Sequence, residues 1–215
     1  IEGQLELCLV ICGDIRRIGV LFCRVDRTVS VFCAAACSTE ALEYLDKVSG
    51  EKPFFMTISH IEPHHQNDRL RFEAPKGAKK SFKNYDIPGD LKGKFGDWKL
   101  QYPSYLACCN RVDVNFGKLI QTLKDEGLYD NTVIIYTSDH GCHFKTRNME
   151  YKRSCHDSSI HTPLVIKSKD YPKGIREDKV VSLVDLPPTL LSLAGIEIPK
   201  QYQGTAILNK DNCEC

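Results

Sequence analysis

Hydrophobic and polar positions follow a regular pattern from residue 39 onward, and their spacing predicts both strands and helices. Short runs of apolar, β-branched residues indicate buried strands, and apolar residues that recur every three to four positions indicate amphipathic helices. Because strands alternate with helices along the chain, the pattern predicts an α/β protein with a largely parallel sheet and helices on both faces. The predicted strands are 53–59, 132–136 and 163–167, and the predicted helices begin at residues 39, 104 and 185.

The helix predicted at 104–126 has the clearest helical spacing in the chain. Apolar residues recur on one face of it between Val112 and Leu123. Pro103 is suited to the start of this helix and Gly127 to its end. The strand at 132–136 follows directly, so the two elements form a helix–strand unit.

The segment 66–103 interrupts this pattern. It is rich in Gly, Pro, Lys and Asp, it has weak periodicity, and it contains the single tryptophan, Trp98. Long irregular segments in compact domains usually form lids or substrate walls. We therefore expect this excursion to border a site.

Residues 1–39 and 209–215 differ from the rest of the chain. The first stretch holds five of the eleven cysteines, scattered arginines and no recognisable motif, so it receives no function and no domain assignment. Residues 40–208 are predicted to form the structured domain, and 209–215 are predicted to be a tail.

Charge and cysteine content restrict the classes of function. The formal net charge is +1, which argues against a nucleic-acid binder, and no apolar run is long enough to cross a membrane. Eleven cysteines could form a disulfide framework, but their number is odd and their spacing fits no zinc motif, which favours reduced thiols. Residues 1–25 lack the uninterrupted apolar core of a signal peptide. We therefore expect a cytoplasmic location.

The residues with candidate chemistry follow two of the predicted strands. All seven histidines lie between positions 60 and 161; His64 follows the strand at 53–59, and Asp139 and His140 follow the strand at 132–136. Open α/β sheets bind ligands at the carboxyl ends of their strands. Several of these side chains are therefore expected to share one pocket.

Each candidate residue has a functional and a structural interpretation. Asp139 with His140 could bind a divalent cation, and imidazole suits zinc or manganese better than calcium, although Asp139 could instead cap the following turn. Lys152 could balance a substrate anion or be an ordinary solvated lysine. His64 could protonate a leaving oxygen or be a surface histidine. The residue types alone leave these alternatives open.

Several motifs resemble the sulfatases of the alkaline phosphatase superfamily. Residues 130–141 (Asp-Asn-Thr-Val-Ile-Ile-Tyr-Thr-Ser-Asp-His-Gly) are similar to a segment in the C-terminal half of the sulfatase catalytic domain. The stretch from Lys52 to the Pro-His pair at 63–64, and Lys152 eleven residues before Pro163, are similar as well. The ending Val-Asp-Leu-Pro-Pro-Thr-Leu-Leu begins at position 184, so the resemblance covers roughly residues 40–208.

This resemblance implies a fold, a reaction and a set of site residues. The fold would be the alkaline-phosphatase-like three-layer fold with a mostly parallel sheet, incomplete at its N-terminus. The reaction would be hydrolysis of sulfate esters, with a sulfated small molecule or glycan as the partner and neither nucleic acid nor membrane involved. Asp139 and His140 would be ligands of a calcium ion, and Lys152 and His64 would hold the sulfate and assist the leaving group. His143 and His156 are weaker candidates for substrate contact.

The sequence also departs from the family pattern. Sulfatases use a formylglycine nucleophile made within a Cys/Ser-x-Pro-x-Arg motif, and no cysteine or serine here stands in that motif. The paired aspartates that complete the metal site in the family are absent as well. We therefore expect this chain alone to be inactive. The alternatives are a non-catalytic remnant or binding module of the same fold, and a phosphate-ester hydrolase that requires two transition metals and a Thr or Ser nucleophile.

Overall fold

A computed structural model of the chain describes residues 6–12, 19–22, 39, 41–47, 54–67, 69–169, 171 and 174–208, the first two ranges by their backbone. The predicted tail at 209–215 and most of the unassigned stretch 1–39 lie outside the described residues. The domain boundaries predicted from the sequence therefore stay predictions.

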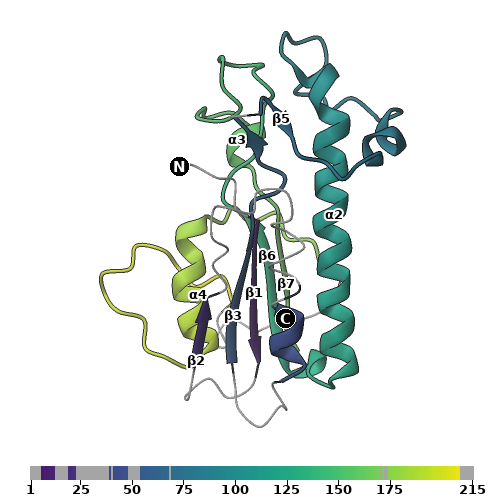
Figure 1. Cartoon of the computed structure of the whole chain (residues 1–215). Helices are drawn as coiled ribbons and strands as arrows, with labels where there is room; N and C mark the ends of the chain where they lie inside the picture. Colours follow the sequence, from purple (N-terminus) through teal and green to yellow (C-terminus); the bar gives the residue numbers. More distant parts are fainter. Residues whose placement is uncertain are drawn as a thin grey trace.

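A five-stranded sheet forms the centre of the molecule (Figure 1), and its strand order is β2-β3-β1-β6-β7. A two-stranded sheet, β4-β5, lies beyond one end of it. The strands are β1 (Glu6–Cys12), β2 (Gly19–Phe22), β3 (Phe54–His60), β4 (His65–Gln66), β5 (Arg71–Phe72), β6 (Thr132–Ser138) and β7 (Leu164–Lys167).

The strand directions do not confirm the expected mostly parallel sheet. Of the pairings between described strands of the large sheet, only β2 with β3 is parallel. β1 lies between β3 and β6 and is antiparallel to both, so that β3 and β6 run in the same direction without pairing. β7 is antiparallel to β6 because the chain leaves β6 at its carboxyl end, forms the segment 139–163, and enters the sheet again from the same edge.

Helices cover the sheet on both faces, as the predicted three-layer arrangement requires. Phe54, Met56 and Ile58 alternate along β3 and pack with Leu119 and Leu123 of α2 (Trp98–Asp125) on one face. Strand side chains that point the other way pack against α4 (Leu186–Leu193) on the opposite face of the sheet. They include Phe55 of β3 and Ile135 of β6. Figure 1 shows α2 and α4 on opposite sides of the sheet. The period-two alternation of strand side chains produces these two cores.

The helix α2 begins at Trp98, earlier than the predicted start at residue 104. The indole N–H of Trp98 donates to the Lys94 carbonyl at 3.1 Å, and Gln101 Nε2 donates to the Leu70 carbonyl at 3.0 Å. Both side chains are buried. These contacts with the excursion extend the helix across Pro103, which lies inside it and does not mark its start.

An aromatic cluster joins the excursion, α2 and the segment after β6. Phe144 lies 5.6 Å from Phe72, 5.3 Å from Tyr102 and 5.3 Å from Tyr105 between ring centroids. Tyr151 contacts the same cluster through Phe72 at 5.9 Å. Edge-to-face contacts of this kind add to the free energy of burying the rings. The cluster therefore fixes the excursion beside the carboxyl ends of β3 and β6.

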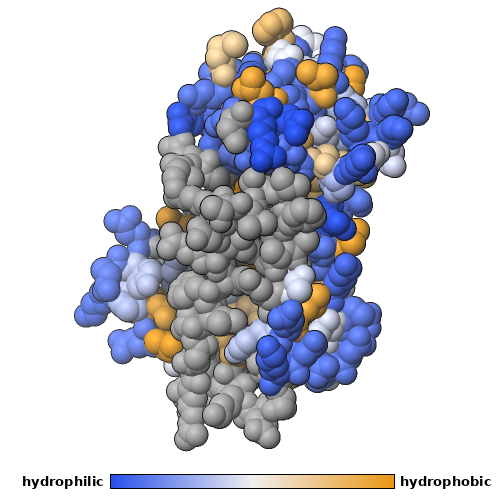
Figure 2. Space-filling view, viewed as in Figure 1, coloured by the Kyte–Doolittle hydropathy of each residue, from blue (hydrophilic) through white to orange (hydrophobic). Residues whose placement is uncertain are grey.

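Short helices complete the fold: η2 (Ala78–Phe82), η3 (Tyr129–Asn131), α3 (Asp157–Ile160) and η4 (Leu183–Asp185), with a further helical turn at 41–45. Within the described ranges, no helix combines the length and the apolar character needed to span a bilayer. Figure 2 shows mostly hydrophilic side chains on the end of the molecule that carries α3, β5 and the excursion.

Candidate active site

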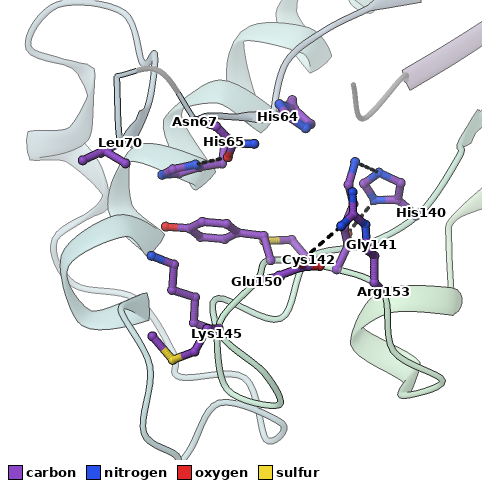
Figure 3. Close-up of a pocket in the computed structure, with 13 residues that line it drawn as sticks. His64, His65, Asn67, Leu70, His140, Gly141, Cys142, Lys145, Glu150 and Arg153 are labelled. Carbon is purple, nitrogen blue, oxygen red and sulfur yellow. Dashed lines mark hydrogen bonds and ion pairs between the residues drawn. The ribbon is translucent and has the colours of Figure 1, made fainter. Parts of the chain in front are cut away.

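The carboxyl ends of β3 and β6 lie at the same edge of the sheet, and a cavity of about 650 Å³ opens there. His64 reaches it from the turn after β3, where its backbone N–H donates to the Ile61 carbonyl at 2.9 Å. His140 and Lys152 line the same cavity from the segment after β6. The structure thus brings together three residues that were predicted to share a site (Figure 3).

His140 and Lys152 form a hydrogen-bonded pair. Lys152 Nζ lies 2.9 Å from His140 Nε2, and His140 Nδ1 lies 2.8 Å from the Gly141 carbonyl oxygen. A carbonyl can only accept, so Nδ1 must carry the ring proton and Nε2 must accept from the Lys152 ammonium. The pair fixes the position of the lysine at the cavity, and the ammonium keeps N–H groups available for an anion.

Asp139 and His140 do not form a complete metal site. The His140 backbone N–H donates to Asp139 Oδ1 at 2.8 Å, and His140 Nε2 lies 3.6 Å from Asp139 Oδ2. Both imidazole nitrogens already lie within hydrogen-bond distance of protein atoms. Across the residues that the structure describes, no group of three or more His, Cys, Asp or Glu is arranged to hold a metal ion. Because calcium requires about six to eight oxygen ligands, this pair can supply only part of a coordination shell.

Gly141 allows the segment after β6 to pack closely against α3. Its N–H donates to the Ser159 carbonyl at 2.8 Å, and a Cβ atom at this position would lie 2.2 Å from the Ser158 carbonyl oxygen. Only glycine fits this approach without displacing the backbone. The close approach fixes the two residues immediately before it, Asp139 and His140, of which His140 lines the cavity.

The opposite part of the cavity is built around Tyr151. Its ring stacks on His65 with centroids 3.9 Å apart, and its hydroxyl donates to Asp97 Oδ2. Lys145 Nζ lies 5.1 Å from the centroid of the same ring and 3.6 Å from Asp97 Oδ2. His65 Nδ1 lies 3.1 Å from Asn67 Oδ1. A connected set of aromatic and charged groups thus forms this side.

Burial changes the ionisation of two groups at the cavity. Burial raises the pKa of the Tyr151 hydroxyl, and the adjacent Asp97 carboxylate raises it further, so Tyr151 stays a hydrogen-bond donor at neutral pH. Burial also raises the pKa of the Cys142 thiol to about 12. Since the thiolate is the reactive form of cysteine, Cys142 is not a nucleophile at neutral pH despite its place in the cavity.

Comparison with known proteins identifies the family. The family model described as Sulfatase matches residues 34–196, which is more than half of the chain. The chain belongs to the sulfatase family. The resemblance carried by the segments at 130–141 and 184–191 is therefore confirmed.

Known sulfatases are similar to this chain over part of their length. Arylsulfatase K of Bos taurus is 38% identical over 104 residues, which are 48% of this chain and 19% of that protein. The N-acetylglucosamine-6-O-sulfatase of Bacteroides thetaiotaomicron is 39% identical over 126 residues, 55% of this chain and 22% of that protein. A presumed sulfatase of Bacteroides fragilis has a similar structure, with a TM-score of 0.71 and 27% identity over 81% of this chain and 40% of its own. The chain thus spans about a fifth of the curated relatives it matches.

Three of the residues predicted in this sulfatase-family chain, Asp139, His143 and His156, do not line the cavity. His143 is fully buried; its Nε2 lies 2.9 Å from the Lys152 carbonyl oxygen, and its backbone N–H donates to the Tyr151 carbonyl. It holds the backbone beneath the lysine. His156 precedes α3, where its carbonyl accepts from the backbone N–H of Ser159 at 2.7 Å. Neither histidine is among the residues that surround the cavity.

Sequence reasoning missed several residues that line the cavity, among them Lys145, Glu150, Tyr151 and Arg153. Their closeness to Lys152 along the chain was the available signal, but it does not separate them from Arg147, which is equally near and does not line the cavity. The contact that distinguishes Tyr151 joins it to Asp97, which lies 54 positions earlier in the sequence. His65 is buried against Tyr151 and belongs to the same wall.

Proposed function

We propose that this chain supplies the sulfate-binding half of the active site of a sulfuric ester hydrolase that acts on sulfated carbohydrates. The observation that carries the proposal is that His64, His140 and Lys152 meet at one cavity. They follow two strands, β3 and β6, that are far apart in the sequence but end at the same edge of the sheet. Membership of the sulfatase family gives the class of reaction. The substrate and the roles of the residues are our inference.

Lys152 is proposed to bind the sulfate group. Its ammonium is held in place by His140 Nε2 at 2.9 Å, so that little side-chain freedom remains to be lost when an anion binds. A fixed cation at this point also favours the transition state, in which negative charge increases on the sulfate oxygens and on the departing oxygen. His64 is proposed to donate a proton to that departing oxygen.

Asp139 is proposed to contribute to a divalent cation site that the described residues do not complete, and His140 would join it only by giving up its hydrogen bond with Lys152. A carboxylate oxygen is a ligand that calcium prefers, and calcium is the ion that the family resemblance implies. When bound, the ion would neutralise negative charge on the sulfate. The nucleophile is proposed to come from outside this sequence, since no cysteine or serine in it precedes x-Pro-x-Arg.

A carbohydrate sulfate is the proposed substrate because of the size of the cavity and the nature of one relative. The cavity of about 650 Å³ is much larger than a sulfate group and is within the range of small-molecule sites. The relative from Bacteroides thetaiotaomicron is named an N-acetylglucosamine-6-O-sulfatase. A sulfated amino sugar is therefore the first ligand to test.

Calorimetric titration of the purified chain with N-acetylglucosamine 6-sulfate tests the proposal. We expect binding that Lys152→Gln weakens at least tenfold, while Lys118→Gln, at an exposed position of α2, leaves it unchanged. No release of sulfate is expected from the chain alone. Binding that is equal in wild type and Lys152→Gln would contradict the proposed site, and sulfate release would contradict the proposed lack of a nucleophile.

The same titration separates the alternative phosphate-ester hydrolase. A site of that class should prefer N-acetylglucosamine 6-phosphate and should respond to zinc or manganese. We expect instead a preference for the sulfate ester and no gain from either metal. A marked preference for the phosphate ester would favour the alternative.

A further inference from the structure

We propose that Lys145 binds a second anionic group of the substrate, on the side of the cavity opposite the His140–Lys152 pair. The inference rests on the proposed function and narrows its substrate class to carbohydrates with two anionic groups, one sulfate to be cleaved and a second sulfate or a carboxylate. Figure 3 shows Lys145 and Leu70 on one side of the cavity and His140 and Arg153 on the other.

Two lysines at the cavity, Lys145 and Lys152, are candidates to bind an anion of the ligand, and Lys145 also has the Asp97 carboxylate at 3.6 Å. Three cationic side chains line it, Lys145, Lys152 and Arg153, against one carboxylate, Glu150. Arg153 Nη1 lies 3.0 Å from Glu150 Oε1, so these two charges balance each other. One sulfate monoester has a single negative charge and requires only one of the two lysines. We therefore assign the other lysine, Lys145, to a second anionic group of the ligand.

The backbone at Lys145 is in an uncommon conformation. Its φ is +59°, in the left-handed region, which is unfavourable for a long side chain that has a Cβ atom. The non-glycine residues with positive φ in the described chain are Leu70, Phe144, Lys145 and Arg153, and all but Phe144 line the cavity. Such conformations cluster at ligand sites, where the surrounding structure enforces them.

The excursion holds Lys145 in this position. The backbone N–H of Asp97 donates to the Phe144 carbonyl at 3.2 Å, and a Cβ atom at Gly96 would lie 2.4 Å from the same carbonyl oxygen. The excursion and the segment after β6 therefore meet without space for a side chain between them. This contact places the Asp97 carboxylate beside Lys145 and orients the ammonium.

The ammonium of Lys145 is oriented but keeps bonding capacity. It lies 3.6 Å from Asp97 Oδ2, which also accepts the Tyr151 hydroxyl, and 5.1 Å from the Tyr151 ring centroid. Its side chain is 31% exposed. An ammonium has three N–H donors, and a partner at 3.6 Å with a shared oxygen does not saturate them. The group is thus prepared for an incoming anion and remains within reach of solvent.

Affinities for matched sugars test this inference. The probes are N-acetylglucosamine 6-sulfate, with one anionic group, and glucosamine 2-N,6-O-disulfate, with two; glucuronic acid 2-sulfate has a carboxylate as its second group. We expect the wild-type chain to bind the disulfate about tenfold more tightly than the monosulfate, the gain of one charge-assisted hydrogen bond. The glucuronic acid 2-sulfate titration shows whether a carboxylate can replace the second sulfate.

The variant Lys145→Asn removes the charge and keeps the backbone, because asparagine tolerates the left-handed conformation better than other residues with a side chain. We expect it to lower the disulfate affinity about tenfold, to leave the monosulfate affinity within about twofold, and to preserve the melting temperature. Lys152→Gln should weaken both ligands by the same factor, and Lys118→Gln should change neither.

The outcomes separate this inference from the function on which it rests. If the monosulfate binds through Lys152 but the disulfate is not preferred, or if the preference survives in Lys145→Asn, the second anion site is wrong and the proposed function stands. A lower melting temperature with equal loss of both ligands would show that Lys145 is structural, and would also overturn the inference. If the wild type binds neither sugar, both proposals fail.

Discussion

Replacement of Gly141 by alanine is the sharpest structural test of the segment that carries Asp139 and His140. The new Cβ atom would lie 2.2 Å from the Ser158 carbonyl oxygen, whereas real Cβ atoms essentially never approach another heavy atom closer than 3.0 Å. The backbone would have to move by most of an ångström, and the hydrogen bond from the Gly141 N–H to the Ser159 carbonyl, now 2.8 Å, would lengthen with it.

The magnitude follows from two costs and one gain. Overpacking costs about 1–3 kcal/mol, and a weakened hydrogen bond costs about 1 kcal/mol. Alanine lowers the conformational entropy of the unfolded chain, which stabilises the folded state by about 0.4–1 kcal/mol. We therefore expect Gly141→Ala to lower the free energy of unfolding by about 2 kcal/mol, which corresponds to a fall of about 4–8 °C in melting temperature for a domain of this size.

Gly117 provides the matched control. It lies inside α2, at an exposed position where an added Cβ atom meets nothing within 4 Å. Gly117→Ala should therefore raise the free energy of unfolding by about 0.5–1 kcal/mol, because alanine is favoured over glycine in helices. Thermal unfolding followed by circular dichroism measures both variants. Equal melting temperatures for Gly141→Ala and wild type would refute the close approach, and so would an equal loss in the control.

Two further predictions concern ionisable groups. The Asp185 carboxylate accepts hydrogen bonds from the backbone N–H groups of Thr205 and Ser182, and these bonds lower the pKa of the carboxyl. The carboxylate therefore stabilises the folded protein above about pH 4, and this contribution is lost as the pH falls through the lowered pKa. Asp185→Asn should cost about 1 kcal/mol in urea unfolding at pH 7 and less at pH 3, and an equal cost at both pH values would contradict this account. Burial raises the pKa of Cys142 to about 12, so iodoacetamide at pH 8 should modify the exposed Cys155 well before Cys142 in peptide mapping; equal rates at the two cysteines would show that Cys142 is not buried as described.

The position of His64 and His140 at one edge of the sheet followed from local sequence. The apolar runs that became β3 and β6 end at His60 and Ser138, and the polar residues just after them reach the same edge of the sheet. This outcome requires only that the two strands run in the same direction, which the intervening helix α2 makes possible. The resemblance to sulfatases then implied roles for these residues, and those roles stay predictions.

The features that the sequence did not predict depend on contacts between distant segments. The start of α2 depends on Gln101, whose partner Leu70 lies 31 positions away, and the wall of the cavity depends on the contact between Tyr151 and Asp97. Neither pair has a local pattern. The antiparallel course of β1 was equally hidden, because residues 6–12 could form a strand in either direction.

Nuclear magnetic resonance of the histidine imidazoles, with N-acetylglucosamine 6-sulfate added to the uniformly ¹⁵N-labelled chain, tests the central claim most directly. His64 and His140 line the cavity, whereas the exposed His161 does not and serves as the internal control. We predict that the ring resonances of His64 and His140 shift together in a saturable manner while those of His161 stay constant. Constant resonances for His64 and His140, or equal shifts for all three histidines, would contradict a sulfate-binding site at this edge of the sheet.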